Sequence, residues 1–326
     1  MMGNFGDRLV EAVRRKKSPA MVGIDPRVDL LPRPIVARYG LGCGASKGIW
    51  ATAVEEFCSR VLDIVAPLVP AVKFQSAFFE QHGATGVATL EVLMRKARRL
   101  GLVVILDAKR GDIGTTSEAY AEAAFGKLAE LQAAGGASDW AADALTVSPY
   151  LGKDSLEPFL KFSRDAGRGL FVLVRTSNPG SRDLQHLSSV QASQPIYRHV
   201  ANWVREWSDA TRGSFGYGSV GAVVGGTAAE QIAELRAALP NAWLLIPGYG
   251  AQGATAADIA GAFDDRGLGA IVNNSRGILF PTIDGDPDAP GAWERSVEAA
   301  LKRMIDDLAQ NTPAGRLRSE EPSRSA

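Results

Sequence analysis

The sequence has few of the residues that build disulfide frameworks and metal sites. It contains 2 Cys and 3 His among 326 residues. Two cysteines cannot form a disulfide framework or a multi-thiolate zinc site, so we expect unpaired thiols in a reducing cytoplasm. The histidines follow no predicted strand and share no partner, so we expect no metal site. These residues are Cys43, Cys58, His82, His186 and His199.

An excess of charge of one sign is also missing. The 36 Lys and Arg residues balance 36 Asp and Glu residues, which gives a formal net charge of zero. This balance argues against a protein whose main task is to bind nucleic acid or an anionic membrane. The longest apolar runs, such as Leu170–Val174, have the length of a strand, and the first residues are charged and amphipathic. We therefore expect no membrane span and no signal sequence.

Apolar residues, glycine and proline are abundant. Hydrophobic residues make up 46% of the chain and the mean hydropathy is −0.03. That supply is sufficient for a sizeable core and excludes wholesale disorder. The 35 Gly and 17 Pro residues together exceed the average share of roughly 12%. This excess indicates a fold with many short loops.

Eight short apolar runs recur along the chain. Each run is continuous and does not alternate with polar residues, which is typical of parallel strands buried on both faces. Helical patterns separate the runs, so the sequence predicts a (β/α)8 barrel in a single domain. A doubly wound open sheet is the alternative. The runs are Ala20–Ile24, Ala71–Phe74, Val103–Leu106, Ala144–Val147, Leu170–Val174, Val220–Val224, Trp243–Ile246 and Ala270–Val272.

The helical patterns have recognisable starts. Asn4 is a candidate N-cap for the first helix, and Thr115, Thr227 and Thr255 each precede an acidic residue by three positions, as in a capping box. The later helices are expected at about 50–66, 85–100, 115–133, 154–166, 196–212, 227–238, 255–265 and 291–309.

The remaining residues fall into two insertions and a tail. We assign residues 1–310 to the barrel, with insertions at about 26–48 and 176–195. Both insertions follow the carboxyl end of a predicted strand, the end at which barrel enzymes build their sites. Residues 311–326 are polar, and we expect them to be a disordered tail.

Charged side chains gather at the second and third predicted strands. Lys73 belongs to the second strand, Asp107 and Lys109 end the third, and Asp112 follows in the loop. Asp107 and Lys109 are two residues apart, so in an extended segment their side chains point to the same face. We expect an alternation of Lys and Asp in a small space, although an ordinary salt-bridge network is the alternative. A lysine held between carboxylates stays protonated and can act as a general acid.

A phosphate site is expected at the last two predicted strands. In barrel enzymes, the loops after these strands commonly bind phosphate. Here one loop is rich in glycine and contains Gln252, and the other contains Arg276. Arg276 could bind a phosphate through two hydrogen bonds, and Gln252 could donate another.

Four segments together resemble the orotidine 5′-phosphate decarboxylase family. They are VKF at 72–74, DAKRGDIG at 107–114, PGYGAQG at 247–253 and SRG at 275–277. The second segment and the long first insertion are similar to the branch often called type 2. The D-x-K-x-x-D motif occurs throughout a wider barrel superfamily, but together with the upstream lysine it is far more specific.

The resemblance implies decarboxylation of orotidine 5′-monophosphate to uridine 5′-monophosphate, the last step of de novo pyrimidine synthesis, without metal or cofactor. Lys109 would protonate C6 of the pyrimidine as carbon dioxide leaves, and Asp107 would disfavour the departing carboxylate. Lys73 would hold Asp107 and contact the ribose. In the family the second Asp of the motif comes from the partner subunit. Asp112 and Thr116 would therefore serve the other protomer of a homodimer.

The resemblance also implies which residues bind the other parts of the substrate. Asp25 would bind a ribose hydroxyl, Ser177 would read the pyrimidine, and Gln252 and Arg276 would bind the phosphate. Three alternatives stay open. They are a magnesium-dependent sugar-phosphate decarboxylase or aldolase of the same superfamily, an enzyme that forms a Schiff base on a lysine, and a barrel that only binds a phosphorylated metabolite.

Overall fold

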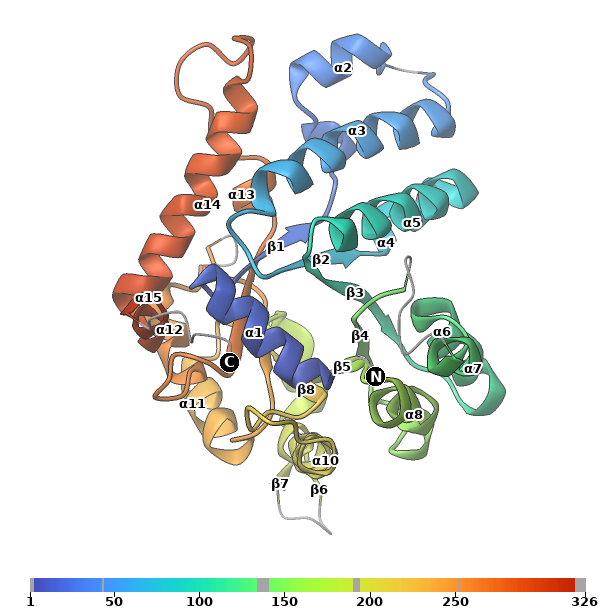
Figure 1. Cartoon of the computed structure of the whole chain (residues 1–326), viewed down its shortest axis with the longest axis vertical. Helices are drawn as coiled ribbons and strands as arrows, with labels where there is room; N and C mark the ends of the chain where they lie inside the picture. The colour runs from blue at the N-terminus through green and yellow to red at the C-terminus, as the bar shows by residue number, and fades with distance from the viewer. Residues whose placement is uncertain (1–2, 43, 134–140, 190–193, 251–252, 320–326) are drawn as a thin grey trace.

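The computed structural model describes residues 3–42, 44–133, 141–189, 194–250 and 253–319. Eight parallel strands close into a barrel in the order β1-β10-β9-β8-β5-β4-β3-β2, with helices around it (Figure 1). The predicted barrel is confirmed, every predicted run forms a strand, and the open sheet is excluded. The strands are β1 (Ala20–Ile24), β2 (Ala71–Gln75), β3 (Val103–Arg110), β4 (Ala144–Val147), β5 (Gly169–Arg175), β8 (Val220–Val224), β9 (Leu244–Ile246) and β10 (Ala270–Asn274).

The helices lie close to their predicted positions. The expected helix at 115–133 is divided near Gly126, whose φ of 85° interrupts it. The larger helices are α1 (Phe5–Lys16), α3 (Lys47–Val65), α5 (Gly83–Arg99), α6 (Gly114–Phe125), α7 (Leu128–Ala133), α8 (Glu157–Ala166), α10 (Ile196–Ala210), α11 (Ala229–Ala238) and α14 (Ala292–Asn311). The shorter ones include α2 (Arg33–Tyr39), α4 (Ala77–Glu80), α9 (Arg182–Gln185), α12 (Ala256–Ile259), α13 (Arg276–Leu279) and α15 (Arg316–Ser319).

Two of the four predicted helix starts are confirmed. Asn4 accepts a hydrogen bond from the backbone N–H of Asp7, and Thr255 forms the predicted capping box at α12. The boxes at Thr115 and Thr227 are wrong, because α6 and α11 are capped at other residues and no side chain bonds there.

Helix α1 covers the amino-terminal end of the barrel. Phe5 is buried and its ring meets the ring of Phe171 edge-on, with 5.9 Å between the centroids. A Cβ atom on Gly6 would lie 2.6 Å from the carbonyl oxygen of Gly218, so only glycine permits this close approach. The indole of Trp243 donates to the carbonyl of Gly6. These contacts close one end of the barrel and leave the other end for a site.

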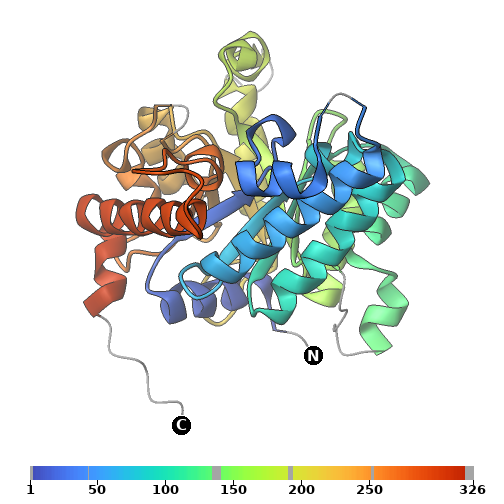
Figure 2. The same cartoon turned by 90° about the horizontal axis from the view of Figure 1, so that it is seen from above.

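The two insertions lie at the open end. Residues 26–48 contain α2, which packs on α3. Residues 176–195 contain α9 and the antiparallel pair β6 (Ser188–Ser189) and β7 (Gln194–Pro195). Figure 2 shows this yellow-green segment standing out from the barrel.

The expected disordered tail is wrong as far as residue 319. Helix α14 extends to Asn311, a 3-10 turn spans Pro313–Gly315, and α15 follows. Ala314 and Leu317 are each 1% exposed and belong to the core. Burial of these two apolar side chains holds the segment, a contribution that its polar composition concealed.

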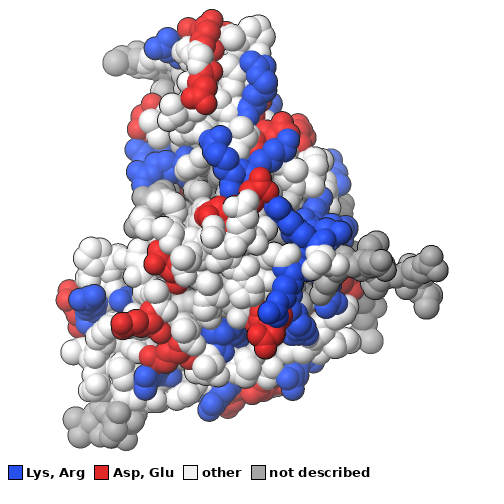
Figure 3. Space-filling model, turned by 90° about the vertical axis from the view of Figure 1, so that its left-hand side faces the viewer, with Lys and Arg blue, Asp and Glu red and all other residues white. Residues whose placement is uncertain are grey.

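None of the described helices is both long and apolar enough to cross a bilayer. Figure 3 shows basic and acidic side chains interspersed on the face that carries α14.

Candidate active site

Strand β3 has an irregular carboxyl end. Its register against β4 shifts between Leu106 and Arg110. Within this shift, Lys109 has φ of 46°, the left-handed region that residues other than glycine rarely adopt. The prediction that Lys109 and Asp107 approach is confirmed, with 2.7 Å between Lys109 Nζ and Asp107 Oδ1. The predicted reason is wrong, since the segment is not regularly extended.

Four donors surround the carboxylate of Asp107, which is 6% exposed. Its Oδ2 accepts from Lys73 Nζ at 2.9 Å and from Gln75 Nε2 at 3.0 Å. Its Oδ1 accepts from Lys109 Nζ and, at 2.8 Å, from Thr146 Oγ1. Each oxygen thus has one ammonium donor and one neutral donor, contributed by β2, β3 and β4.

The ammonium groups keep this buried aspartate ionised. Burial alone would raise the pKa of Asp107, but Lys73 and Lys109 outweigh burial and hold the pKa well below its usual range. Burial alone would lower the pKa of Lys73, but Asp107 and Asp25 outweigh it, so the pKa of Lys73 is raised. At neutral pH Asp107 is therefore negatively charged and Lys73 beside it is positively charged.

A cavity of about 780 Å³ opens above this cluster at the carboxyl ends of the strands. Asp25 lines this cavity, and its buried Oδ1 lies 3.7 Å from Lys73 Nζ without a hydrogen bond. A buried acceptor without a donor can take a hydroxyl group from a ligand. Of the residues predicted from sequence, the cavity brings together Asp25, Lys73, Asp107, Lys109, Ser177 and Arg276.

Two predicted site residues are not among those that line this cavity, and a third cannot be placed relative to it. Asp112 and Thr116 do not line it; Asp112 accepts from the N–H of Ile113, and Thr116 is exposed. The four-charge alternation expected from spacing is therefore not formed within one chain. Gln252 lies outside the described residues.

Sequence reasoning assigned no role to several polar residues that line the cavity. Thr146 is the polar residue of the otherwise apolar strand β4, and Gln75 ends β2. Asn273 and Asn274 end β10, and each has a buried side-chain oxygen without a hydrogen-bond partner. Polar residues within or at the ends of buried strands were the available signal.

The structure also locates the scarce metal-binding residue types. Where the chain is described, no group of three or more His, Cys, Asp or Glu side chains is placed to hold a metal ion. Cys58 is buried and unpaired, and burial raises the pKa of its thiol. Cys43 lies outside the described residues.

A closed parallel barrel with polar groups at the carboxyl ends of its strands is the architecture of a barrel enzyme that acts on a small molecule. The family model described as "Orotidine 5'-phosphate decarboxylase / HUMPS family" matches residues 23–281. The chain belongs to this family.

Relatives support this assignment over nearly the whole chain. The orotidine 5′-phosphate decarboxylase of Rhodopirellula baltica is 44% identical over 94% of this chain and 99% of its own. That of Caldicellulosiruptor saccharolyticus is 37% identical over 86% of this chain and 90% of its own. The structure of Leishmania donovani OMP decarboxylase matches with a TM-score of 0.70 at 31% identity, covering 98% of this chain and 100% of that chain.

Proposed function

We propose that this chain decarboxylates orotidine 5′-monophosphate to uridine 5′-monophosphate in de novo pyrimidine synthesis. The observation that carries the proposal is the Lys73–Asp107–Lys109 cluster in the cavity at the carboxyl end of the barrel. Relatives that cover almost the whole chain bear the name of this activity.

The chemistry needs an acid beside a poorly stabilised carbanion. Carbon dioxide leaves as its bond to C6 breaks, and the electron pair of that bond remains on C6. Lys109 Nζ then transfers a proton to C6, which leaves a neutral amine. The ammonium stabilises charge that develops in the transition state more than it stabilises the substrate, as catalysis requires.

Asp107 acts on the ground state in this proposal. Its carboxylate stays ionised and lies beside the position of the substrate carboxylate, so the two like charges repel. Lys73 holds Asp107 through its 2.9 Å contact and faces the ribose. Asp25, whose buried Oδ1 has an ion pair with Lys73 but no hydrogen bond, accepts from a ribose hydroxyl.

Different residues bind the two ends of the substrate in this proposal. Ser177, in the segment after β5, reads the pyrimidine. Arg276 at the start of α13 and Gln252, in the segment that follows β9, bind the phosphate. Binding energy from the phosphate and ribose is remote from the bond that breaks, and it contributes by ordering the loops around the reacting carbon.

A second copy of the chain completes the site in our proposal. Asp112 and Thr116 do not line the cavity of their own chain, so in a homodimer they would serve the partner's site. Three large apolar side chains near Asp112 are exposed, namely Ile113, Tyr150 and Leu151. The loops that carry them meet, since a Cβ on Gly111 would lie 3.2 Å from the carbonyl oxygen of Ser148. Their exposure favours a protein interface at this rim.

The position of Lys73 argues against the magnesium-dependent alternative. Its ammonium lies 2.9 Å from Asp107 and 3.7 Å from Asp25. A cation already occupies the space between the two carboxylates that a divalent ion would need. Turnover that persists in excess chelator would exclude the alternative directly, and failure of borohydride to trap an adduct would exclude a Schiff base.

An absorbance assay for loss of orotidine 5′-monophosphate tests the proposal. The wild-type chain should turn over substrate, while Lys109→Ala and Asp112→Asn should each be inactive alone. Mixed Lys109→Ala and Asp112→Asn protomers should regain partial activity, because some mixed dimers contain one intact site. Wild-type turnover in both variants would refute the assignment. A cytoplasmic location stays a prediction from composition.

A further inference from the structure

The hydroxyl of Thr146 connects the two central residues of the site. Thr146 lies in β4, is 1% exposed and lines the cavity. Its Oγ1 accepts from the backbone N–H of Lys109 at 2.9 Å and donates to Asp107 Oδ1 at 2.8 Å. One side chain therefore bonds both to the peptide that carries the acid and to the carboxylate beside it.

We infer that Thr146 is a positioning residue that fixes Lys109 and Asp107 relative to each other, an inference that rests on the proposed function. The two hydrogen bonds run in one direction, from the peptide N–H through the hydroxyl to the carboxylate. Each bond polarises the next, and the anionic acceptor strengthens the chain. An apolar side chain of the same shape could neither accept from the N–H of Lys109 nor donate to Asp107.

The backbone of Lys109 explains why such a link is needed. Its φ of 46° lies in a region that costs a residue with a Cβ free energy. This conformation persists only where the surroundings determine it. The hydrogen bond from Lys109 N to Thr146 is one such constraint, and it acts at the strained residue itself. Without it, Lys109 loses the partner that holds its peptide in the left-handed turn.

Gln75 provides an internal comparison. It donates to Asp107 Oδ2 at 3.0 Å, on the opposite side of the carboxylate. It shows no hydrogen bond to Lys109 among the described contacts. Gln75 thus orients one partner, whereas Thr146 joins both.

Thr146→Val and Thr146→Ser separate the hydroxyl from the packing. Valine keeps the shape and removes the hydroxyl, and serine restores it. We expect Thr146→Val to lower kcat roughly 10- to 100-fold with KM within about threefold of wild type, and Thr146→Ser to recover most of kcat. Loss of a donor to Asp107 raises the pKa of that carboxyl, so the acidic limb of the kcat–pH profile should move to higher pH in Thr146→Val. Thr89→Val, which alters a buried threonine of α5 outside the cavity, is the matched control.

The outcomes distinguish this inference from the proposed function. An inactive wild-type chain refutes the function, whereas an active one with wild-type kcat and pH profile in Thr146→Val refutes the role of Thr146. A serine variant as slow as the valine variant also refutes it, because packing would then be the cause. A crystal structure of Thr146→Val without substrate tests the placement independently of activity. Lys109 should leave the left-handed region, and an unchanged Lys109 backbone with its 2.7 Å contact to Asp107 would overturn the inference.

Discussion

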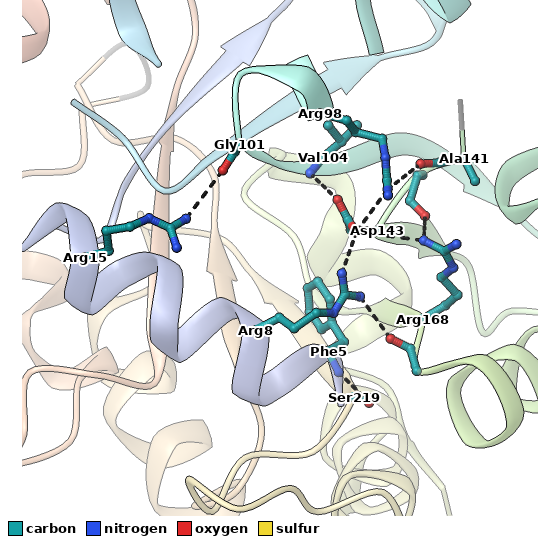
Figure 4. Close-up of polar contacts among 12 residues, drawn as sticks. Phe5, Arg8, Arg15, Arg98, Gly101, Val104, Ala141, Asp143, Arg168 and Ser219 are labelled. Atoms are coloured by element: carbon teal, nitrogen blue, oxygen red, sulfur yellow. Dashed lines mark hydrogen bonds and ion pairs between the residues drawn. The ribbon is translucent and has the colours of Figure 1, made fainter. Parts of the chain in front are cut away.

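Two buried aspartates, at opposite ends of the barrel, are each held by more than one cation. Asp107 lies at the carboxyl end of β3, and Asp143 immediately precedes β4 at the amino end. Figure 4 shows Asp143 accepting from Arg8 at 2.6 Å, from Arg98 at 3.1 Å and from the N–H of Val104 at 2.9 Å. Both aspartates have a lowered pKa, because nearby cations outweigh their burial.

The cations differ in kind and in what else they bind. At the closed end they are arginines, whose several donors also reach backbone carbonyls. Arg8 bonds to Gly167, Arg98 to Ala141 and Arg168 to Ala142, which ties α1, α5 and the loops before β4 and β5 together. At the open end they are lysines with compact ammonium groups, and the side chain of Lys109 is 46% exposed to the cavity. The closed charge cluster crosslinks the fold, whereas the open one leaves the ammonium group of Lys109 accessible from the cavity.

Lys109→Ala should give the largest effect and act on activity alone. The variant removes the proposed acid and its charge, so we expect kcat to fall by at least about 10⁴-fold. The denaturation midpoint should change little, because the side chain is half-exposed. The absorbance assay measures the first quantity and urea unfolding the second. Lys161→Ala, at an exposed position of α8, is the control, and a kcat within tenfold of wild type would contradict the prediction.

Asp143→Asn should show the opposite pattern. It leaves Arg8 and Arg98 without their counter-charge, and breaking a buried ion pair costs about 3–5 kcal/mol of unfolding free energy. The folded fraction should keep wild-type kcat, because Asp143 lies outside the cavity. Urea unfolding gives the stability, with Asp165→Asn at an exposed position as the control. A stable but inactive Asp143→Asn protein would abolish the distinction between the two ends.

Acid should reduce the contribution of Asp143 to the free energy of unfolding. The pKa of folded Asp143 lies below its ordinary 3.8, because Arg8 and Arg98 outweigh its burial. A lowered folded pKa gives stability that is fully present above the unfolded pKa and is lost as pH falls through the folded pKa. The stability advantage of wild type over Asp143→Asn should therefore be constant near neutral pH and shrink below about pH 4. An advantage that grows on acidification would contradict this sign.

An exposed ion pair should have the smallest effect on the free energy of unfolding. Arg33 and Asp288 are 3.4 Å apart, with 77% and 55% of their side chains exposed. Water screens such a pair, so Arg33→Ala should change the unfolding free energy by no more than about 0.5 kcal/mol. Urea unfolding at low and high salt measures the change. A loss as large as that of Asp143→Asn would show that burial does not determine the value of these pairs.

The sequence predicted the elements that carry the site but not their detailed contacts. Continuous apolar runs located all eight strands of the barrel, because a strand buried on both faces must be apolar along its length. Lys73, Asp107 and Lys109 were found because they interrupt or end such runs. Asp143 and Thr146 were missed, since their partners lie far along the chain; Arg8 is 135 residues from Asp143, and Thr146 is 39 residues from Asp107. The tail was misjudged because two buried apolar residues outweigh its polar composition.

The sequence by itself determined the barrel and the end of it where polar groups gather, because both follow from local patterns of apolar and polar residues. Only the tertiary structure decided how the charges meet. The register shift of β3 against β4 and the left-handed conformation of Lys109 depend on the neighbouring strand. That neighbouring strand, β4, also supplies the hydroxyl of Thr146, which accepts from the N–H of Lys109. Hydrogen bonds between strands fix these positions, and no spacing within one strand records them.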